Sequence, residues 1–256
     1  MLFPKLVPQG MSYVKIPSSK RAAMRVLLET VQRGSHYFTT GTVEVAKALG
    51  FADKMARLYR ADVTQAQRAY AKANGKANTS LTVFPESCLT LRWWLLVTPG
   101  QGVVHEREQL MDAHDKHTHL SWGDQYELAH KQHPQSQGGG RHWTWRLREP
   151  HRAELETAIR LLAAAHGSPQ PRQDDLGRLV EALLRMPGFH GIREQLKELF
   201  KVGAETWQRT HAASESFPWP EKLPYLDKAF ACYHVPEPLR LDVLVHALLH
   251  QCDIQF

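Results

Sequence analysis

The alternation of residues in segment 89–98 limits the fold of this chain more than any other sequence feature. In LTLRWWLLVT, every second residue from Leu89 to Val97 is apolar, and the residues between them are mixed. A period of two predicts a strand, here with one fully buried face and a mixed second face. Residues 80–84 predict a shorter strand, and residues 85–88 can turn between the two. We therefore expect a β-hairpin over residues 80–98.

A second hairpin is predicted from segments 125–131 and 141–148. The loop between them ends in three glycines, residues 138–140. In RHWTWRLR, the apolar residues Trp143, Trp145 and Leu147 alternate with polar and basic ones. One face of this hairpin is therefore expected in the core, and the other is expected to be basic and open to solvent.

Helical spacing of apolar residues predicts helices on both sides of the hairpins. Ser18 or Ser19 can cap a first helix that Gly34 closes. The expected helices are 20–33, 42–73, 104–113, 151–165, 173–186, 190–211 and 237–251, with an extended piece at 35–40. This order predicts an α+β fold, in which amino-terminal basic helices pack with an antiparallel sheet of two hairpins and an all-helical carboxy-terminal region follows. We expect two domains, 1–150 and 151–256, with residues 167–171 as the clearest linker.

Positive charge is concentrated at the amino end of the chain. Residues 1–80 hold thirteen Lys and Arg against four Asp and Glu, a balance of +9 in a chain whose net charge is +6. The remaining residues therefore carry a balance of −3. Such segregation focuses the electric field on one surface and indicates a polyanionic partner.

Much of this positive charge is predicted to lie along one side of a helix, as a basic stripe. If residues 43–76 form one helix, most of its lysines and arginines fall in an arc that is separate from the apolar arc, with Arg60 outside it. Phosphates along a DNA or RNA strand are what such a stripe can neutralise. Trp94 is a candidate for base stacking, and the second hairpin would extend the surface. The predicted nucleic-acid contacts are Lys47, Lys54, Arg57, Arg60, Arg68, Lys72, Trp94, Arg141, Arg146 and Arg148.

The same segment also fits a helix-turn-helix. Ala46 and Gly50 are four residues apart, as in the turn of that motif, and Asp53 would cap a recognition helix from Lys54 to about Ala73. The first hairpin would then be a wing, although its strand 89–97 is too apolar to be exposed. A long amphipathic helix packed on a sheet is therefore the favoured geometry.

Eight of the fifteen histidines lie between residues 105 and 151. The segment DAHDKHTH offers zinc-ligand types, but no HExxH is present, and exposed loop histidines are the favoured interpretation; no metal or cofactor is expected. An endonuclease is the alternative function, with His36, His142 or the 105–119 cluster in acid-base roles. Strands, a basic helix and a glycine-rich loop together resemble the ferredoxin-like RNA-processing endonucleases of CRISPR systems, in architecture alone.

Several function classes are excluded by missing motifs. The chain has no P-loop, no strand-borne GxGxxG and no GxSxG, which argues against the usual ATPases, dinucleotide enzymes and serine hydrolases. With three dispersed cysteines, no signal peptide and no apolar span, we expect a cytoplasmic protein without a membrane partner. The sequence favours a non-enzymatic nucleic-acid-binding protein that acts in replication, transfer, regulation or a nucleoprotein complex. A third hypothesis is a structural subunit that docks a protein partner through its helical region 152–256.

Overall fold

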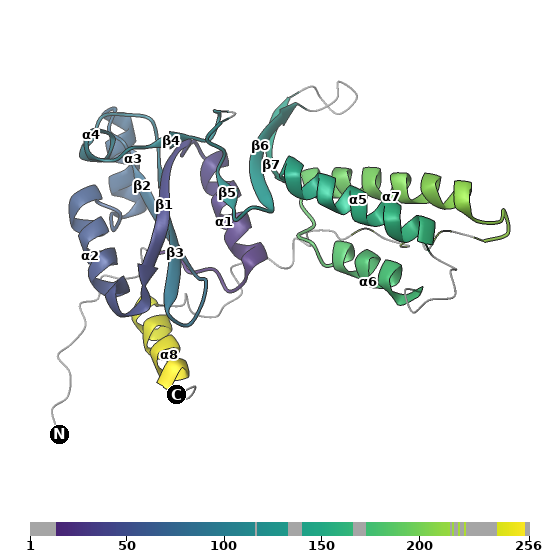
Figure 1. Cartoon of the computed structure of the whole chain (residues 1–256). Helices are drawn as coiled ribbons and strands as arrows, with labels where there is room; N and C mark the ends of the chain where they lie inside the picture. Colours follow the sequence, from purple (N-terminus) through teal and green to yellow (C-terminus); the bar gives the residue numbers. More distant parts are fainter. Residues whose placement is uncertain are drawn as a thin grey trace. The chain divides into compact units, whose positions relative to one another are not determined.

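The chain folds as two compact units (Figure 1). The computed structural model describes residues 14–115, 117–132, 140–165, 173–215, 217, 220, 223 and 240–253. The first unit comprises Met1–His119 with Phe230–Phe256, and the second comprises Leu120–Ala229. The division therefore falls after residue 119, whereas the sequence suggested residue 150. The expected linker at 167–171 lies outside the described residues.

A four-stranded antiparallel sheet forms the centre of the first unit. Its strands are β1 (Tyr37–Glu44), β2 (Thr79–Pro85), β3 (Thr90–Val97) and β4 (Met111–Asp112), in the order β2-β3-β1-β4. The predicted first hairpin is confirmed, since β2 and β3 pair in antiparallel register with Leu81 opposite Leu95. Lys15 extends the sheet beyond β2, because its N–H donates to the Leu81 carbonyl at 3.0 Å.

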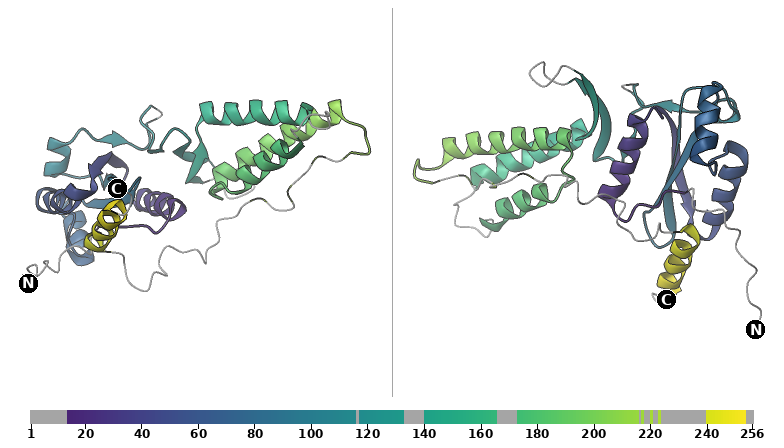
Figure 2. Two further views of the ribbon diagram at one scale, coloured as in Figure 1. Left: turned by 60° about the horizontal axis from the view of Figure 1, so that its bottom comes forward. Right: turned by 180° about the vertical axis from the view of Figure 1, so that it is seen from behind.

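Helices cover both faces of this sheet. Helix α1 (Lys20–Gln32) lies on one face, and α2 (Ala48–Tyr59) lies on the other, as both views in Figure 2 show. Helix α8 (Leu241–Asp253) joins the α2 side, where Leu241 and Val245 enter the same apolar cluster as Leu95. On the mixed face of β3, which turns away from α2, Trp94 and Leu96 are also fully buried, while Arg92 stays partly exposed. The Ser19 side chain caps α1, as one of the two expected caps.

The predicted helix over 42–73 is wrong. Residues 37–44 form β1, a 3-10 turn covers Val45–Lys47, and α2 ends at Arg60, which adopts a left-handed conformation with φ 55°. Helix α3 (Gln65–Ala73) then starts afresh. The reason is tertiary, because β1 pairs along its whole length with β3 and so gains sheet hydrogen bonds that the local sequence does not reveal.

The helix-turn-helix interpretation is also wrong. Helix α2 runs through Gly50 without a break, and the turn that ends it lies ten residues later. The element order of the unit (helix, strand, two helices, two strands) also differs from the β-α-β-β-α-β order of the ferredoxin-like fold. The helix expected at 104–113 is shorter, as α4 (Val103–Arg107), because the chain then turns into β4.

The second unit joins a three-stranded sheet to three helices. Its antiparallel strands are β5 (Ser121–Trp122), β6 (Tyr126–Gln132) and β7 (Arg141–Leu147), and its helices are α5 (Glu149–Ala165), α6 (Gln173–Leu184) and α7 (His190–Thr210). The predicted second hairpin is confirmed as β6 and β7. The α+β class is thus confirmed, with the two hairpins in separate sheets.

Helix α7 packs on β7 and α5 through its apolar stripe. Ile192, Leu196, Leu199 and Phe200 are fully buried, which confirms that this stripe is core. The Gln195 side chain also contacts the backbone of β7: its Oε1 accepts from the Leu147 N–H at 2.7 Å, and its Nε2 donates to the Leu147 carbonyl at 3.1 Å. A protein partner of region 152–256 would therefore have to bind other faces of these helices. None of the helices in the described part of the chain has the length and hydropathy needed to cross a bilayer.

Candidate nucleic-acid interface

Helix α3 has no buried residue, although along the chain it lies between α2 and β2 of the folded first unit. Its start is fixed by a capping box, in which the Thr64 Oγ1 accepts from the Gln67 N–H at 3.4 Å and the Gln67 Oε1 accepts from the Thr64 N–H at 2.9 Å. Arg68 holds the preceding loop through bonds to the Val63 and Ala61 carbonyls, each 3.2 Å long. Polar contacts therefore stabilise α3, whereas most helices are stabilised by apolar packing.

Because packing contributes so little, the cap should control the local stability of α3. Replacing Thr64 with alanine is expected to destabilise this helix by about 1 kcal/mol and to speed amide hydrogen exchange in residues 65–73 about fivefold. Replacing it with serine keeps the hydroxyl acceptor and should leave the exchange rates close to those of the parent protein. Equal protection in the alanine and serine variants would contradict the assignment.

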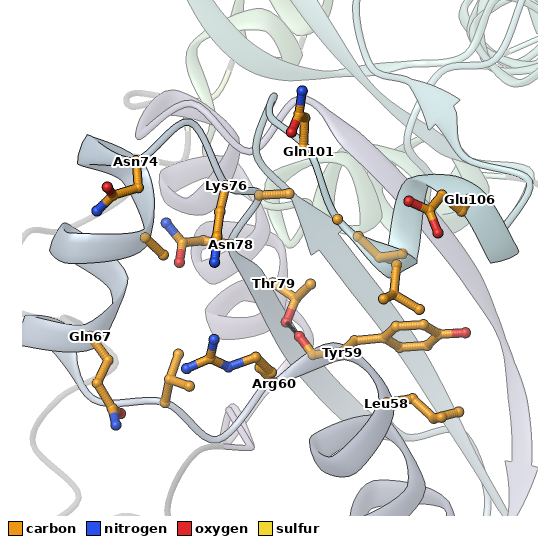
Figure 3. Close-up of a pocket in the computed structure, with 16 residues that line it drawn as sticks. Leu58, Tyr59, Arg60, Gln67, Asn74, Lys76, Asn78, Thr79, Gln101 and Glu106 are labelled. Atoms are coloured by element: carbon orange, nitrogen blue, oxygen red, sulfur yellow. Dashed lines mark hydrogen bonds between the residues drawn. The ribbon is translucent and has the colours of Figure 1, made fainter.

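One side of α3 presents an exposed aromatic ring that shares a cavity with two cations. Tyr70 is 72% exposed and lines a cavity of about 320 Å³ together with Arg60 and Lys76. Figure 3 shows Arg60 and Lys76 extending toward one another from opposite sides of the adjoining cavity, whose volume is about 400 Å³. The left-handed backbone at Arg60 directs the chain out of α2 at this point.

Amide side chains supply most of the remaining polarity of that larger cavity. They are Gln67, Asn74, Asn78 and Gln101, with Glu106 as the carboxylate on the far side (Figure 3). Amides can both donate and accept hydrogen bonds, as the edges of nucleobases require. Tyr59 also lines this cavity. Its hydroxyl keeps its proton, because burial and then the hydrogen bond to Glu108 raise its pKa to about 12.

The basic residues predicted from sequence divide between α2 and α3. Lys47 pairs with Glu44 at 2.9 Å and Arg57 pairs with Asp53 at 2.5 Å, while Lys54 is exposed on α2. Arg60 ends α2 and borders the cavity on the Tyr70 side of α3. Arg68 and Lys72 belong to α3 and border a second cavity on its opposite side. The continuous stripe does not exist, because the helix that would carry it is broken at Arg60.

The three arginines of the second hairpin belong to the second unit. Arg146 pairs with the buried Glu127 at 2.6 Å and Arg148 contacts Asp124 at 3.4 Å, while Arg141 is exposed at the start of β7. Two of the three charges are therefore partly neutralised within their own sheet.

The prediction that Trp94 stacks on a base is wrong. Tyr70 is an exposed aromatic residue that the sequence analysis did not select. Trp94 is 0% exposed, on the face of β3 that turns away from α2. The periodicity that predicts one helix over 43–76 puts Tyr70 on the apolar side of that helix, but its neighbours three and four residues away are Ala66, Gln67, Ala73 and Asn74. The lack of any large apolar residue at those positions was the signal that this ring has no stripe to join.

Two candidate histidines come from the first unit. The His36 ring lies 4.4 Å from the His114 ring, and the His114 Nδ1 lies 3.1 Å from an Asp112 oxygen. Desolvation and then His114 lower the pKa of His36, and Asp112 opposes them. His142 contacts His190 in the second unit instead.

The described residues contain no group of three His, Cys, Asp or Glu side chains that could hold a metal ion. Gly138 and Gly139 of the glycine triplet lie outside the residues that the structure describes. Comparison with known protein families, with curated proteins and with solved structures gives no match for this chain.

Proposed function

We propose that this protein binds nucleic acid through helix α3, with Tyr70 as a base-stacking residue and the surrounding cations as phosphate contacts. One observation carries the proposal: a helix with no buried residue presents an exposed tyrosine, with Arg60 and Lys76 on one side and Arg68 and Lys72 on the other. Positively charged grooves with aromatic platforms are how proteins bind single strands without reading sequence.

The geometry favours unpaired bases over duplex. A ring that projects from a short helix can stack only on a base whose own stack is open, because the bases of a duplex are covered by their neighbours. The amide-lined cavity beside Tyr70 suits the hydrogen-bonding edge of such a base. Single-stranded DNA or RNA is therefore the proposed ligand, for a role in replication, transfer, regulation or a nucleoprotein complex.

A salt-resolved titration of the full chain with single-stranded and duplex DNA and RNA tests this proposal. We expect the logarithm of the binding constant to fall linearly with the logarithm of salt concentration, with a slope of about −0.7 for each phosphate neutralised on a single strand. Lys76→Gln should reduce the slope by about 0.7. Lys201→Gln, an exposed lysine of α7, is the matched control and should not change it. Failure to bind any strand at low salt would sink the proposal.

A nuclease is the second candidate, favoured by the His36, His114 and Asp112 arrangement. Two imidazoles in contact, one of them oriented by a carboxylate, could divide the acid and base roles of phosphodiester cleavage. The strands recovered from the same titration, run on a gel, show whether cleavage occurs. Strands that the parent protein shortens and the His114→Ala variant leaves intact would favour this function over simple binding.

A further inference from the structure

A second cavity lies on the other side of α3 from Tyr70, and its charge is all of one sign. Its volume is about 270 Å³, several times the roughly 30 Å³ that one water takes in the liquid. Four cations line it: Lys15 beside β2, Arg33 after α1, and Arg68 and Lys72 of α3. The other lining side chains are hydroxyls, amides and one alanine, without a carboxylate among them.

These cations have few neutralising partners. Arg33 contacts Glu29 at 3.4 Å, but no carboxylate in the described part of the chain lies within salt-bridge distance of Lys15, Arg68 or Lys72. The Lys15 Nζ donates to the Thr30 Oγ1 at 2.9 Å, and Thr30 in turn donates to the Val26 carbonyl. That chain of bonds fixes the ammonium in the wall while leaving it further protons to donate.

A buried hydroxyl on the same wall lacks a partner. Ser80 of β2 is 5% exposed, and its Oγ makes no hydrogen bond within the described residues. Buried polar groups are nearly always satisfied, so an unpaired hydroxyl in a lining that also holds four cations is consistent with a ligand that supplies the missing bond.

We propose that this cavity binds a phosphoryl dianion, either the terminal phosphate of a nucleic-acid strand or a free phosphate. Two guanidinium groups and two ammonium groups match phosphate oxygens in charge, the guanidinium groups also in geometry, and a serine hydroxyl can donate to a further oxygen. Four cations suit two negative charges on one group better than the single charge of a phosphodiester inside a strand. The inference goes beyond the proposed function, because binding of free phosphate does not require that α3 bind nucleic acid.

The electrostatic environment of Lys15 also favours the binding of an anion. Burial, Arg68 and Arg33 lower its pKa to about 8, and Glu29 alone opposes them. Below that pH the ammonium is charged and the cationic set is complete; as the pH rises through 8 one charge is lost. Phosphate stays mainly dianionic over this range, so its affinity for the protein should fall as the pH increases.

Calorimetric titration of the full chain with inorganic phosphate is the first test. We expect binding at neutral pH, weakened about tenfold in Lys15→Met and in Ser80→Ala, and unchanged in Lys201→Met. The Ser80 variant guards against misfolding, because removing an unpaired buried hydroxyl should leave the fold intact. The fall in affinity above pH 8 should disappear in Lys15→Met.

Oligonucleotides of one sequence with a 5′-phosphate, a 3′-phosphate or only hydroxyl ends identify the source of the phosphate. Tighter binding of one phosphorylated strand, lost in Ser80→Ala, assigns the cavity to a strand end. Binding of inorganic phosphate without any preference among strands assigns it to a free phosphate. Absence of both overturns the inference, and if the hydroxyl-ended strand still binds, the proposed function of α3 survives that result.

Discussion

Replacing Tyr70 with alanine should weaken binding of single-stranded DNA or RNA by about tenfold or more, while the melting temperature stays unchanged. Stacking of one base on an aromatic side chain contributes about 1–3 kcal/mol, and a loss of 1.4 kcal/mol corresponds to tenfold in affinity. The fold is insensitive because the ring is 72% exposed and α3 has no buried residue. Fluorescence anisotropy with a labelled strand measures the affinity, and differential scanning calorimetry measures the stability.

Tyr70→Phe is the matched control for this experiment. It keeps the aromatic face and removes only the hydroxyl, so the affinity should stay close to that of the parent protein. Binding of duplex of equal length should change less than binding of single strand in the alanine variant, because only the latter offers an open base. An alanine variant that binds single strands as tightly as the parent would remove Tyr70 from the interface.

Replacing Gln195 with leucine is expected to lower the free energy of unfolding of the second unit by about 2–4 kcal/mol. Gln195 is buried and satisfies both backbone groups of Leu147, and leucine of similar size would leave a buried N–H and a buried carbonyl without partners. Each such orphan costs about 1–3 kcal/mol. Denaturant unfolding followed by tryptophan fluorescence, to which the buried Trp145 of this unit contributes, measures the change.

Gln208→Leu is the control, since the same change then falls on an exposed position of the same helix. Its effect should stay within about 0.5 kcal/mol, as for most surface substitutions. Equal destabilisation by the two substitutions would mean that the Gln195 side chain contributes through general polarity of α7 and not through Leu147.

Short-range patterns predicted the fold where the neighbours in space are also neighbours in sequence. Both hairpins and the first helix with its Ser19 cap could be read from alternation, periodicity and turn residues. The failure at residues 42–47 has the opposite origin. The partner of β1 is β3, so that Thr40 faces Trp94, a contact between residues that are far apart in the chain. No local pattern contains that information.

The candidate interface was also predicted only in part, because local patterns reveal some of its residues and tertiary structure determines the rest. Local charge predicts Arg60, Arg68 and Lys72 as contacts. The end of α2 positions Arg60, and α3 positions the other two. The exposure of Tyr70 depends on the break at Arg60, and the roles of Lys15 and Ser80 depend on a strand that brings them beside α3. Charge can be counted along a sequence, whereas a cavity exists only after the chain has folded.

The placement of α8 has a consequence for the order of events during synthesis. Its Leu241 and Val245 complete the same cluster as Val45 and Ala48, yet the whole second unit is encoded between them. A growing chain can therefore finish the inserted unit while the first still lacks part of its core. The apolar core beneath α2 would therefore be completed last, although most of its residues are translated first.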